Sequence, residues 1–310
     1  MDIIIVGNPG FAGKIAEVLP ASTFIGIEER VFPDGEVCPR LLLSEKKQLE
    51  GNHIVIAMQL KLNQPKNQYL ITLLWTIHNV KRHNPSRISC IMPYHLYSRQ
   101  DRESRKGEPI SSKHLASTLE SAGIDDFVTI NSHTHGKVDI ANFFTNSQAS
   151  DLSALPILGT ALRSHISSPQ KSICISPDEG ALFLARDLAK AINTPYSTAI
   201  QKTRDVNTGE ITQNLEGLSF EIKDRTVIII DDLVSSGKTM IGAANILKDK
   251  GAKGLIYAYI HAVHSPVSFA KMQEVEPTLT IATDTIKTNI EGLTTVSVIP
   301  LICNWIKENS

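Results

Sequence analysis

Two adjacent acids and a small-residue loop form the segment with the most distinctive chemistry in the sequence. Residues 227–239 read Val-Ile-Ile-Ile-Asp-Asp-Leu-Val-Ser-Ser-Gly-Lys-Thr. The backbone N–H groups of Ser235–Thr239 can point at a phosphate, and the dipole of a helix that follows favours its charge. Asp231 and Asp232 beside an anion site require a second ligand, either ribose hydroxyls or a bound Mg²⁺. The alternative is an acidic strand end with a serine-rich turn.

The same loop also has some likeness to a nucleotide-binding P-loop, through Gly237, Lys238 and Thr239. A P-loop needs another glycine five residues before its Gly-Lys pair. That position is occupied by Asp232. The spacing therefore excludes a P-loop.

Composition excludes several classes of protein. The 310 residues suffice for two domains, and a net charge of −1 argues against wholesale binding of nucleic acid. The four cysteines are far apart and form no CxxC pair, which argues against zinc ribbons and redox motifs. There is no apolar run of 18 residues and no basic leader before the first apolar run. We expect a cytoplasmic protein without a membrane partner.

Apolar runs alternate with segments of helical periodicity, and this order positions the loop. Leu115, Leu119 and Ala122 share one helix face, as do Met240, Ala243, Ala244 and Leu247. Continuous apolar runs are typical of strands covered on both faces. The pattern predicts an α/β fold with mainly parallel sheets and two domains, 1–148 and 149–310. The predicted strands are Asp2–Val6, His53–Ala57, Ile88–Met92, Phe127–Ile130, Ile173–Ile175, Thr226–Ile230 and Leu255–Ile260.

The acidic loop resembles the phosphoribosyl-diphosphate loop of phosphoribosyltransferases and of ribose-phosphate diphosphokinase. Further segments are similar to the diphosphokinase (PRPP synthetase) family, and the similarity follows the family's order from about residue 3 to residue 305. These segments are Arg30–Glu36, Gln64–Asn67, Pro93–Arg102, Glu108–Ser111, Ser176–Gly180 and Thr283–Ile286.

This resemblance implies two phosphoribosyltransferase-like (Rossmann-like) domains, the first binding ATP and the second ribose 5-phosphate. The sequence leaves open whether the last helix packs on the first domain. The implied reaction transfers the β,γ-diphosphate of ATP to the 1-hydroxyl of ribose 5-phosphate and releases AMP. The family also implies Mg²⁺ and a homo-oligomer, either a dimer or a hexamer.

The resemblance assigns roles residue by residue. Lys202 and Arg204 match a basic pair on the family's mobile catalytic loop, and His133 and Asp178 match groups near the metal. His133 is thus expected both in catalysis and near Mg²⁺, although imidazole is an unusual Mg²⁺ ligand. The residues matched to ATP are Phe32, Asp34, Glu36, Arg99, Gln100, Asp101 and Arg102. The residues matched to ribose 5-phosphate are Asp231, Asp232, Ser235, Ser236, Gly237, Lys238 and Thr239.

Three positions depart from the family pattern, and one of them is Ser235, which takes the place of a common loop acid. Thr203 stands where the family usually has a third basic residue, and Lys238 replaces the second loop glycine.

Two other functions stay open. A phosphoribosyltransferase that consumes the diphosphate explains the acidic loop but not Phe32–Glu36 or Arg99–Arg102. A non-catalytic regulatory subunit of a true synthetase is the other alternative, although the proposed catalytic groups are all present.

Overall fold

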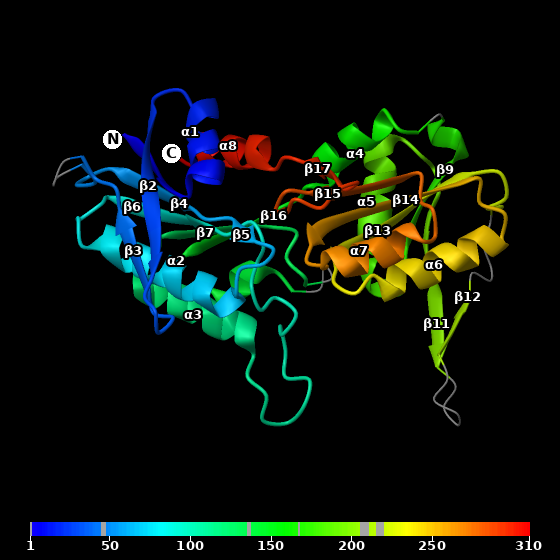
Figure 1. Ribbon diagram of the computed structural model, residues 1–310, viewed down its shortest axis with the longest axis horizontal. Coiled ribbons are helices and arrows are strands. Elements are labelled where there is room, and N and C mark those ends of the chain that lie inside the picture. The colour runs from blue at the N-terminus through cyan, green and yellow to red at the C-terminus, as the bar shows by residue number, and fades with distance from the viewer. Residues whose placement is uncertain (1, 45–47, 135–137, 167, 205–210, 215–219) are drawn as a thin grey trace. The chain divides into compact units, whose positions relative to one another are not determined.

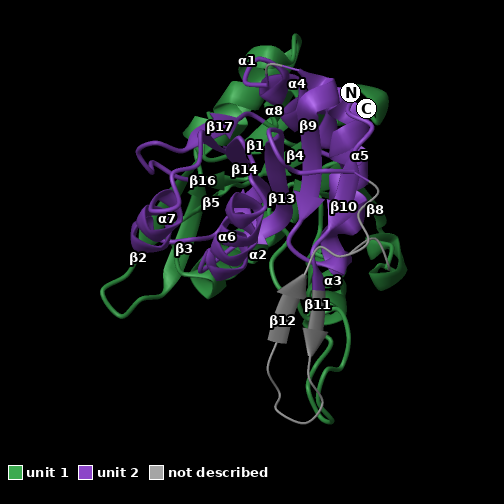
Figure 2. Ribbon diagram, turned by 90° about the vertical axis from the view of Figure 1, so that its right-hand side faces the viewer, with its two compact units in different colours: residues 1–152, 285–287, 298–310 green, residues 153–284, 288–297 purple. Residues whose placement is uncertain are grey.

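The chain folds into two compact units, each built on its own sheet. The computed structural model describes residues 2–44, 48–134, 138–166, 168–204, 211–214 and 220–310, without the side chains of 202–204 and 211–214 (Figure 1). Unit 1 comprises residues 1–152, 285–287 and 298–310, and unit 2 comprises residues 153–284 and 288–297 (Figure 2). The main division follows residue 152, whereas the sequence placed it after residue 148.

Unit 1 contains a seven-stranded sheet in the order β3-β2-β1-β4-β6-β7-β8. Only β2 and β3 pair in an antiparallel manner, whereas the other neighbours are parallel. The central strands are buried because their apolar side chains are covered on both faces. The strands are β1 (Ile3–Gly7), β2 (Ser22–Val31), β3 (Val37–Leu41), β4 (His53–Ala57), β6 (Arg87–Ile91), β7 (Asp126–Ile130) and β8 (Gln148–Leu152). The helices are α1 (Lys14–Val18), α2 (Lys66–Lys81), α3 (Ser111–Ala122) and α8 (Ile299–Glu308).

The last helix, α8, returns to unit 1, and both chain ends lie near α1 and α8 (Figure 1). Trp305 Nε1 donates to Ser150 Oγ at 3.1 Å. Arg87 donates to the backbone oxygen of Asn309 and forms two bonds of 2.7 Å with the Asp126 carboxylate. A bidentate, largely buried ion pair of this kind therefore fixes the C-terminal end of the chain beside β6 and β7. A further strand pair of this unit joins β5 (Leu60–Lys61) to β16 (Ile286–Lys287).

The same carboxylate ends a buried chain of His53, Ser89 and Asp126 that has the composition of a hydrolase triad. Ser89 Oγ donates to Asp126 at 2.7 Å, and His53 Nε2 lies 2.8 Å from Ser89 Oγ. Because the hydroxyl proton goes to Asp126, the imidazole must donate to Ser89 and cannot remove its proton. Burial lowers the pKa of His53. The cluster is therefore structural, at the amino ends of β4, β6 and β7.

Unit 2 contains a six-stranded parallel sheet in the order β10-β9-β13-β14-β15-β17. Its strands are β9 (Ser172–Ser176), β10 (Ser197–Ala199), β13 (Thr226–Val234), β14 (Gly254–Ala262), β15 (Leu279–Thr283) and β17 (Thr294–Val296). Its helices are α4 (Leu155–Arg163), α5 (Leu182–Ile192), α6 (Lys238–Asp249) and α7 (Pro266–Gln273). An antiparallel pair, β11 (Gln201–Arg204) and β12 (Ile211–Asn214), forms a separate two-stranded sheet.

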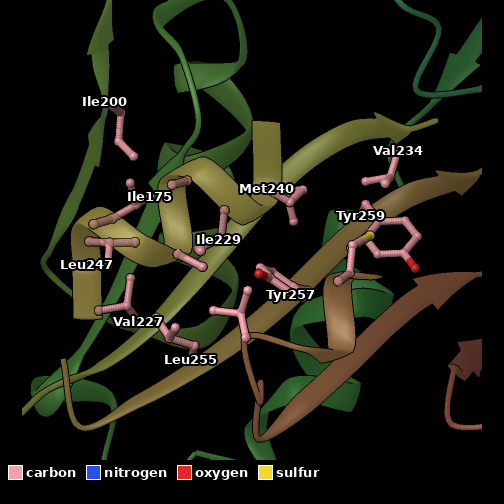
Figure 3. Packing of buried hydrophobic residues seen from close by; sticks show 14 of the residues in the cluster. Ile175, Ile200, Val227, Ile229, Val234, Met240, Leu247, Leu255, Tyr257 and Tyr259 are labelled. Atoms are coloured by element: carbon pink, nitrogen blue, oxygen red, sulfur yellow. The ribbon is translucent and has the colours of Figure 1, made fainter. Parts of the chain in front are cut away.

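One cluster of the core of unit 2 lies between its sheet and α6. Figure 3 shows Ile229, Tyr257 and Met240 among the side chains that fill this space. The predicted helix face is confirmed, since Met240, Ala243, Ala244 and Leu247 are all buried. Packing of this face holds the start of α6 against the carboxyl end of β13, where the acidic loop lies.

All seven predicted strands are confirmed, and most of their ends agree within one or two residues. The strand predicted at Thr226–Ile230 continues to Val234 because residues beyond Ile230 still pair with β14. Asp231 and Asp232 therefore lie within β13, and α6 begins at Lys238 rather than after Thr239. None of the helices in the described ranges is long and apolar enough to cross a membrane.

Candidate active site

The turn from β13 into α6 contains only Ser235, Ser236 and Gly237. Gly237 is the N-cap of α6 and has a left-handed φ of 73°. A Cβ at this position would lie 2.5 Å from Met272 Cγ on α7. Glycine is therefore required for both backbone conformation and space. Ser235 and Ser236 are exposed, so the rim of the turn faces solvent.

This turn is suited to an anion. Gly237 has no side chain that could cap α6, and Lys238 N donates to Ser236 Oγ only at 3.5 Å, so the first N–H groups of the helix can donate to an incoming phosphate. The helix dipole adds a favourable interaction with negative charge. The exposed Lys238 stands at the first position of the helix. These features make residues 235–239 a candidate site for a phosphate, which is the role that the resemblance implies for them.

Three carboxylates lie near one another beside this turn. Asp231 is in β13, the buried Asp232 follows it, and Asp178 comes two residues after β9. Burial, and then the charges of Asp232 and Asp178, raise the pKa of Asp231 well above its ordinary value. The backbone N–H of Asp232 donates to Asp231 Oδ1 at 3.0 Å. Sugar hydroxyls or a cation would relieve this repulsion.

In unit 1, three of the residues matched to ATP, Phe32, Asp34 and Glu36, lie at the tip of the β2–β3 hairpin. Phe32 N donates to the Glu36 carbonyl oxygen at 2.8 Å, and Asp34 Oδ1 accepts from Glu36 N at 3.1 Å. Phe32 is 41% exposed, and the Arg30 guanidinium lies 4.9 Å from its ring centroid. The tip is thus ordered by its own hydrogen bonds while its aromatic ring stays accessible.

The tip also borders a hollow of about 540 Å³ against α2. Gly35, Glu36 and Val37 line one side, and α2 contributes Asn67, Gln68, Ile71 and Trp75 to the other.

The second set of predicted ATP residues lies in the loop between β6 and α3. Gln100 Nε2 donates to the backbone oxygen of Arg102 at 3.0 Å and to Glu108 Oε2 at 3.3 Å. Arg99 and Arg102 are exposed, so their guanidinium groups can meet phosphates. Within the described residues, no hydrogen bond or ion pair joins Arg99–Arg102 to the hairpin tip.

His133 lies three residues after β7 and is half-buried. Lys202 and Arg204 fall in β11, but their side chains lie outside the described part of the chain. Residues 205–210, which follow them, are also outside it.

Sequence reasoning missed two groups that support the site. Met272 limits position 237 to glycine, and Asp151 of β8 accepts three hydrogen bonds from Ser132, the neighbour of His133. Gly237 itself was the only sequence feature that pointed to a tight contact. No local pattern links Asp151 to a turn 19 residues earlier in the chain.

We predict that Gly237→Ala lowers stability more than Gly51→Ala does. Gly51 has a nearly identical φ of 72°, but no atom lies within 4 Å of the place that a Cβ would occupy there. The difference in unfolding free energy between the two variants therefore isolates the clash with Met272. Overpacking of this kind costs about 1–3 kcal/mol. Urea unfolding of both variants measures it. Equal losses at both positions would contradict the tight packing of the turn.

We predict that Asp231→Asn stabilises the protein at neutral pH. A raised folded-state pKa means that ionisation of Asp231 destabilises the fold as pH rises above its ordinary value of 3.8. Asparagine does not ionise, so its advantage should grow as pH rises above 3.8, the ordinary pKa of an aspartate. The melting temperature should rise by roughly 2–4 °C for each 1 kcal/mol gained. The control is Asp187→Asn, at an exposed carboxylate. An equal gain in melting temperature at both positions would show that the neighbouring carboxylates of Asp231 are not the cause.

Comparison with known proteins gives the same assignment for both units. Residues 3–123 match the N-terminal domain of ribose phosphate pyrophosphokinase, and residues 159–298 match the phosphoribosyl transferase domain. The ribose-phosphate pyrophosphokinase of Methanothermobacter thermautotrophicus is 31% identical over 297 residues, which is 96% of each chain. That of Sulfurisphaera tokodaii is 31% identical over 308 residues, covering 98% of this chain and 100% of the relative.

The fold agrees with these sequence matches. The crystal structure of phosphoribosylpyrophosphate synthetase from Mycobacterium smegmatis matches with a TM-score of 0.86 and 28% identity, covering 100% of both chains. With two domains matched in order and relatives aligned over nearly their whole length, this chain belongs to the ribose-phosphate pyrophosphokinase family.

Proposed function

We propose that this chain is a Mg²⁺-dependent ribose-phosphate diphosphokinase. It would transfer the β,γ-diphosphate of ATP to the 1-hydroxyl of ribose 5-phosphate, giving 5-phosphoribosyl 1-diphosphate and AMP. The observation that carries this proposal is the β13–α6 turn, where a helix start suited to an anion adjoins paired acids. Family membership supports the same reaction.

The 5-phosphate of the sugar would bind at residues 235–239. Backbone N–H groups of the turn, together with Lys238, would neutralise its charge. Asp231 and Asp232 would accept hydrogen bonds from the ribose 2- and 3-hydroxyls. The ring is then held at two ends, which fixes the direction of the 1-hydroxyl for attack on the β-phosphorus.

ATP would bind through unit 1. Phe32, on a loop that in this family is usually supplied by a neighbouring subunit, would stack on the adenine, while Asp34 and Glu36 accept hydrogen bonds from the adenine amino group. Arg99 and Arg102 would pair with phosphate oxygens, and Gln100 and Asp101 complete the segment. The exposure of Phe32, Arg99 and Arg102 supports these roles, because each group can reach a ligand.

Mg²⁺ would be held by Asp178, with His133 near it. The donor set fits the ion, because Asp232 and Asp178 raise the pKa of Asp231, and a cation near these three carboxylates would offset that repulsion. In the described ranges, no three His, Cys, Asp or Glu side chains are placed to form a metal cage. Mg²⁺ commonly uses one or two carboxylates and completes its shell with water and phosphates. When bound, it would neutralise charge on the ATP phosphates.

Lys202 and Arg204 would meet the transferring group in the transition state. Phosphoryl-type transfer depends on positioning and on neutralising charge spread over oxygens. Two cations on a loop that closes only over bound substrates would provide this and exclude water. This assignment rests on the family resemblance of residues 201–204.

The two alternatives make different predictions. A phosphoribosyltransferase would not need the hairpin tip or the arginine loop of unit 1. A regulatory subunit would not need Lys202, Arg204, His133 and Asp178 together. We also propose that the chain works as a homo-oligomer, a dimer or a hexamer, in the cytoplasm, with ATP and ribose 5-phosphate as its partners.

The products of the reaction test the proposal. With ATP labelled at the β-phosphorus, ribose 5-phosphate and Mg²⁺, the label should appear in a sugar diphosphate, and unlabelled AMP should form in equal amount. Asp231→Ala/Asp232→Ala should abolish product formation by removing the hydroxyl acceptors. Formation of ADP would identify an ordinary kinase. Absence of product from the wild-type protein would favour the regulatory subunit.

We predict that Lys202→Ala lowers kcat by about 10²–10³-fold, the scale for loss of one positioned transition-state donor. Binding of ATP should change little, because the group acts mainly in the transition state. Steady-state kinetics and calorimetric ATP titration measure the two quantities. Lys190→Ala, which removes an exposed lysine paired with Asp187 in the same unit, is the matched control. An unchanged kcat would move the catalytic role to another residue.

A further inference from the structure

The turn that carries His133 is held by a carboxylate from the neighbouring edge strand. Asp151 in β8 accepts the backbone N–H of Ser132 at 3.0 Å on Oδ1 and 3.1 Å on Oδ2. Its Oδ2 also accepts the Ser132 hydroxyl at 2.6 Å. All three contacts end on Ser132, directly before His133. A short hydroxyl-to-carboxylate bond of this kind is among the stronger protein hydrogen bonds.

Backbone contacts fix the same turn on both sides of Ser132. Asn131 has a left-handed φ of 41°, and its N–H donates to the Leu152 carbonyl oxygen at 3.1 Å. Thr134 N donates to the Ser132 carbonyl oxygen at 2.7 Å. β8 thus supplies both a backbone acceptor and a carboxylate to the residues before His133, and this arrangement restricts the direction of its side chain.

Burial makes the carboxylate important to this turn. Ser132 is 6% exposed, whereas Asp151 is exposed at the sheet edge. Without Asp151, the Ser132 N–H would lose its acceptor in a site with little access to water. A buried donor without a partner costs about 1–3 kcal/mol, enough to make another turn conformation competitive. The turn could then relax while the rest of the sheet remains folded.

We propose that Asp151 is a positioning residue, which acts through Ser132 to orient His133 toward the metal and the ATP phosphates. Asp151 itself does not touch substrate in this role. The inference rests on the proposed function of His133 and adds a residue to it. Groups that orient a residue beside a metal commonly change activity or metal affinity by about 10–100-fold.

Kinetics of Asp151 variants give the first test. Asp151→Ala should lower kcat by about 10–100-fold, while the KM for ribose 5-phosphate, which binds in unit 2, changes less than about twofold. Asp151→Asn keeps an acceptor oxygen and should recover most of the activity. Ser132→Ala loses only the hydroxyl bond and should fall between them. Equal losses in the Ala and Asn variants would overturn the proposal.

Glu120→Ala is the matched control. Glu120 Oε1 accepts backbone N–H groups of Thr145, Asn146 and Ser147, just before β8 begins. It therefore resembles Asp151 in chemistry but holds the loop at the other end of the same strand. Its loss should leave kcat within about twofold. A loss equal to that of Asp151→Ala would show that the effect is general loosening of β8.

A double-mutant cycle with His133→Ala shows whether Asp151 acts through His133. If it does, Asp151→Ala should have almost no further effect on kcat in the His133→Ala background, because the group being oriented is gone. An undiminished further loss of about 10-fold or more in that background would overturn the proposal.

The final readout does not depend on activity. In ¹⁵N-labelled protein without ligands, the His133 imidazole signals, assigned with His133→Ala, should shift or broaden in Asp151→Ala and stay unchanged in Glu120→Ala. Unchanged His133 signals in Asp151→Ala would overturn the proposal even if kcat fell. If the wild-type protein formed no sugar diphosphate, the proposed function would fail, whereas this measurement would still report whether Asp151 orders His133.

Discussion

The three-residue turn between β13 and α6 is the constraint on which the rest of the site depends. The chain passes from a parallel strand into a helix within three residues, and Gly237 adopts the left-handed conformation that this turn uses. Met272 then occupies the space where a side chain would be. As a result, the start of α6 is fixed relative to Asp231, and the proposed anion site and the two proposed hydroxyl acceptors lie on one short segment.

The site concentrates negative charge before any ligand binds. Asp231 is destabilised by burial and by Asp232 and Asp178, so its pKa is raised. A fold without a function would have no reason to keep three acids together, because apolar or amide side chains would be more stable there. In the proposed reaction, hydroxyl donors and a cation would relieve the repulsion among these acids when they bind. The stability that the free protein loses to this repulsion would then contribute to its affinity for substrates.

Unit 1 depends on contacts between distant parts of the chain. Arg87 and Asp126 join the starts of β6 and β7 to Asn309 near the C-terminus, and Trp305 in α8 donates to Ser150 in β8. On the same edge strand, Asp151 holds the turn before His133. The strand beside β7 thus connects the closing helix with the proposed catalytic histidine.

The sequence alone determined the elements and the chemistry of the main loop. Continuous apolar runs identified strands such as His53–Ala57 because covering both faces of a strand leaves a local pattern. The loop at 231–239 could be recognised for a similar reason, because its acids and small residues lie in one short segment. Only the tertiary structure showed that β13 continues through Asp231 and Asp232, that Met272 restricts Gly237, and that Asp151 holds Ser132. These features depend on pairing and contact between residues far apart in the chain, which no local pattern records.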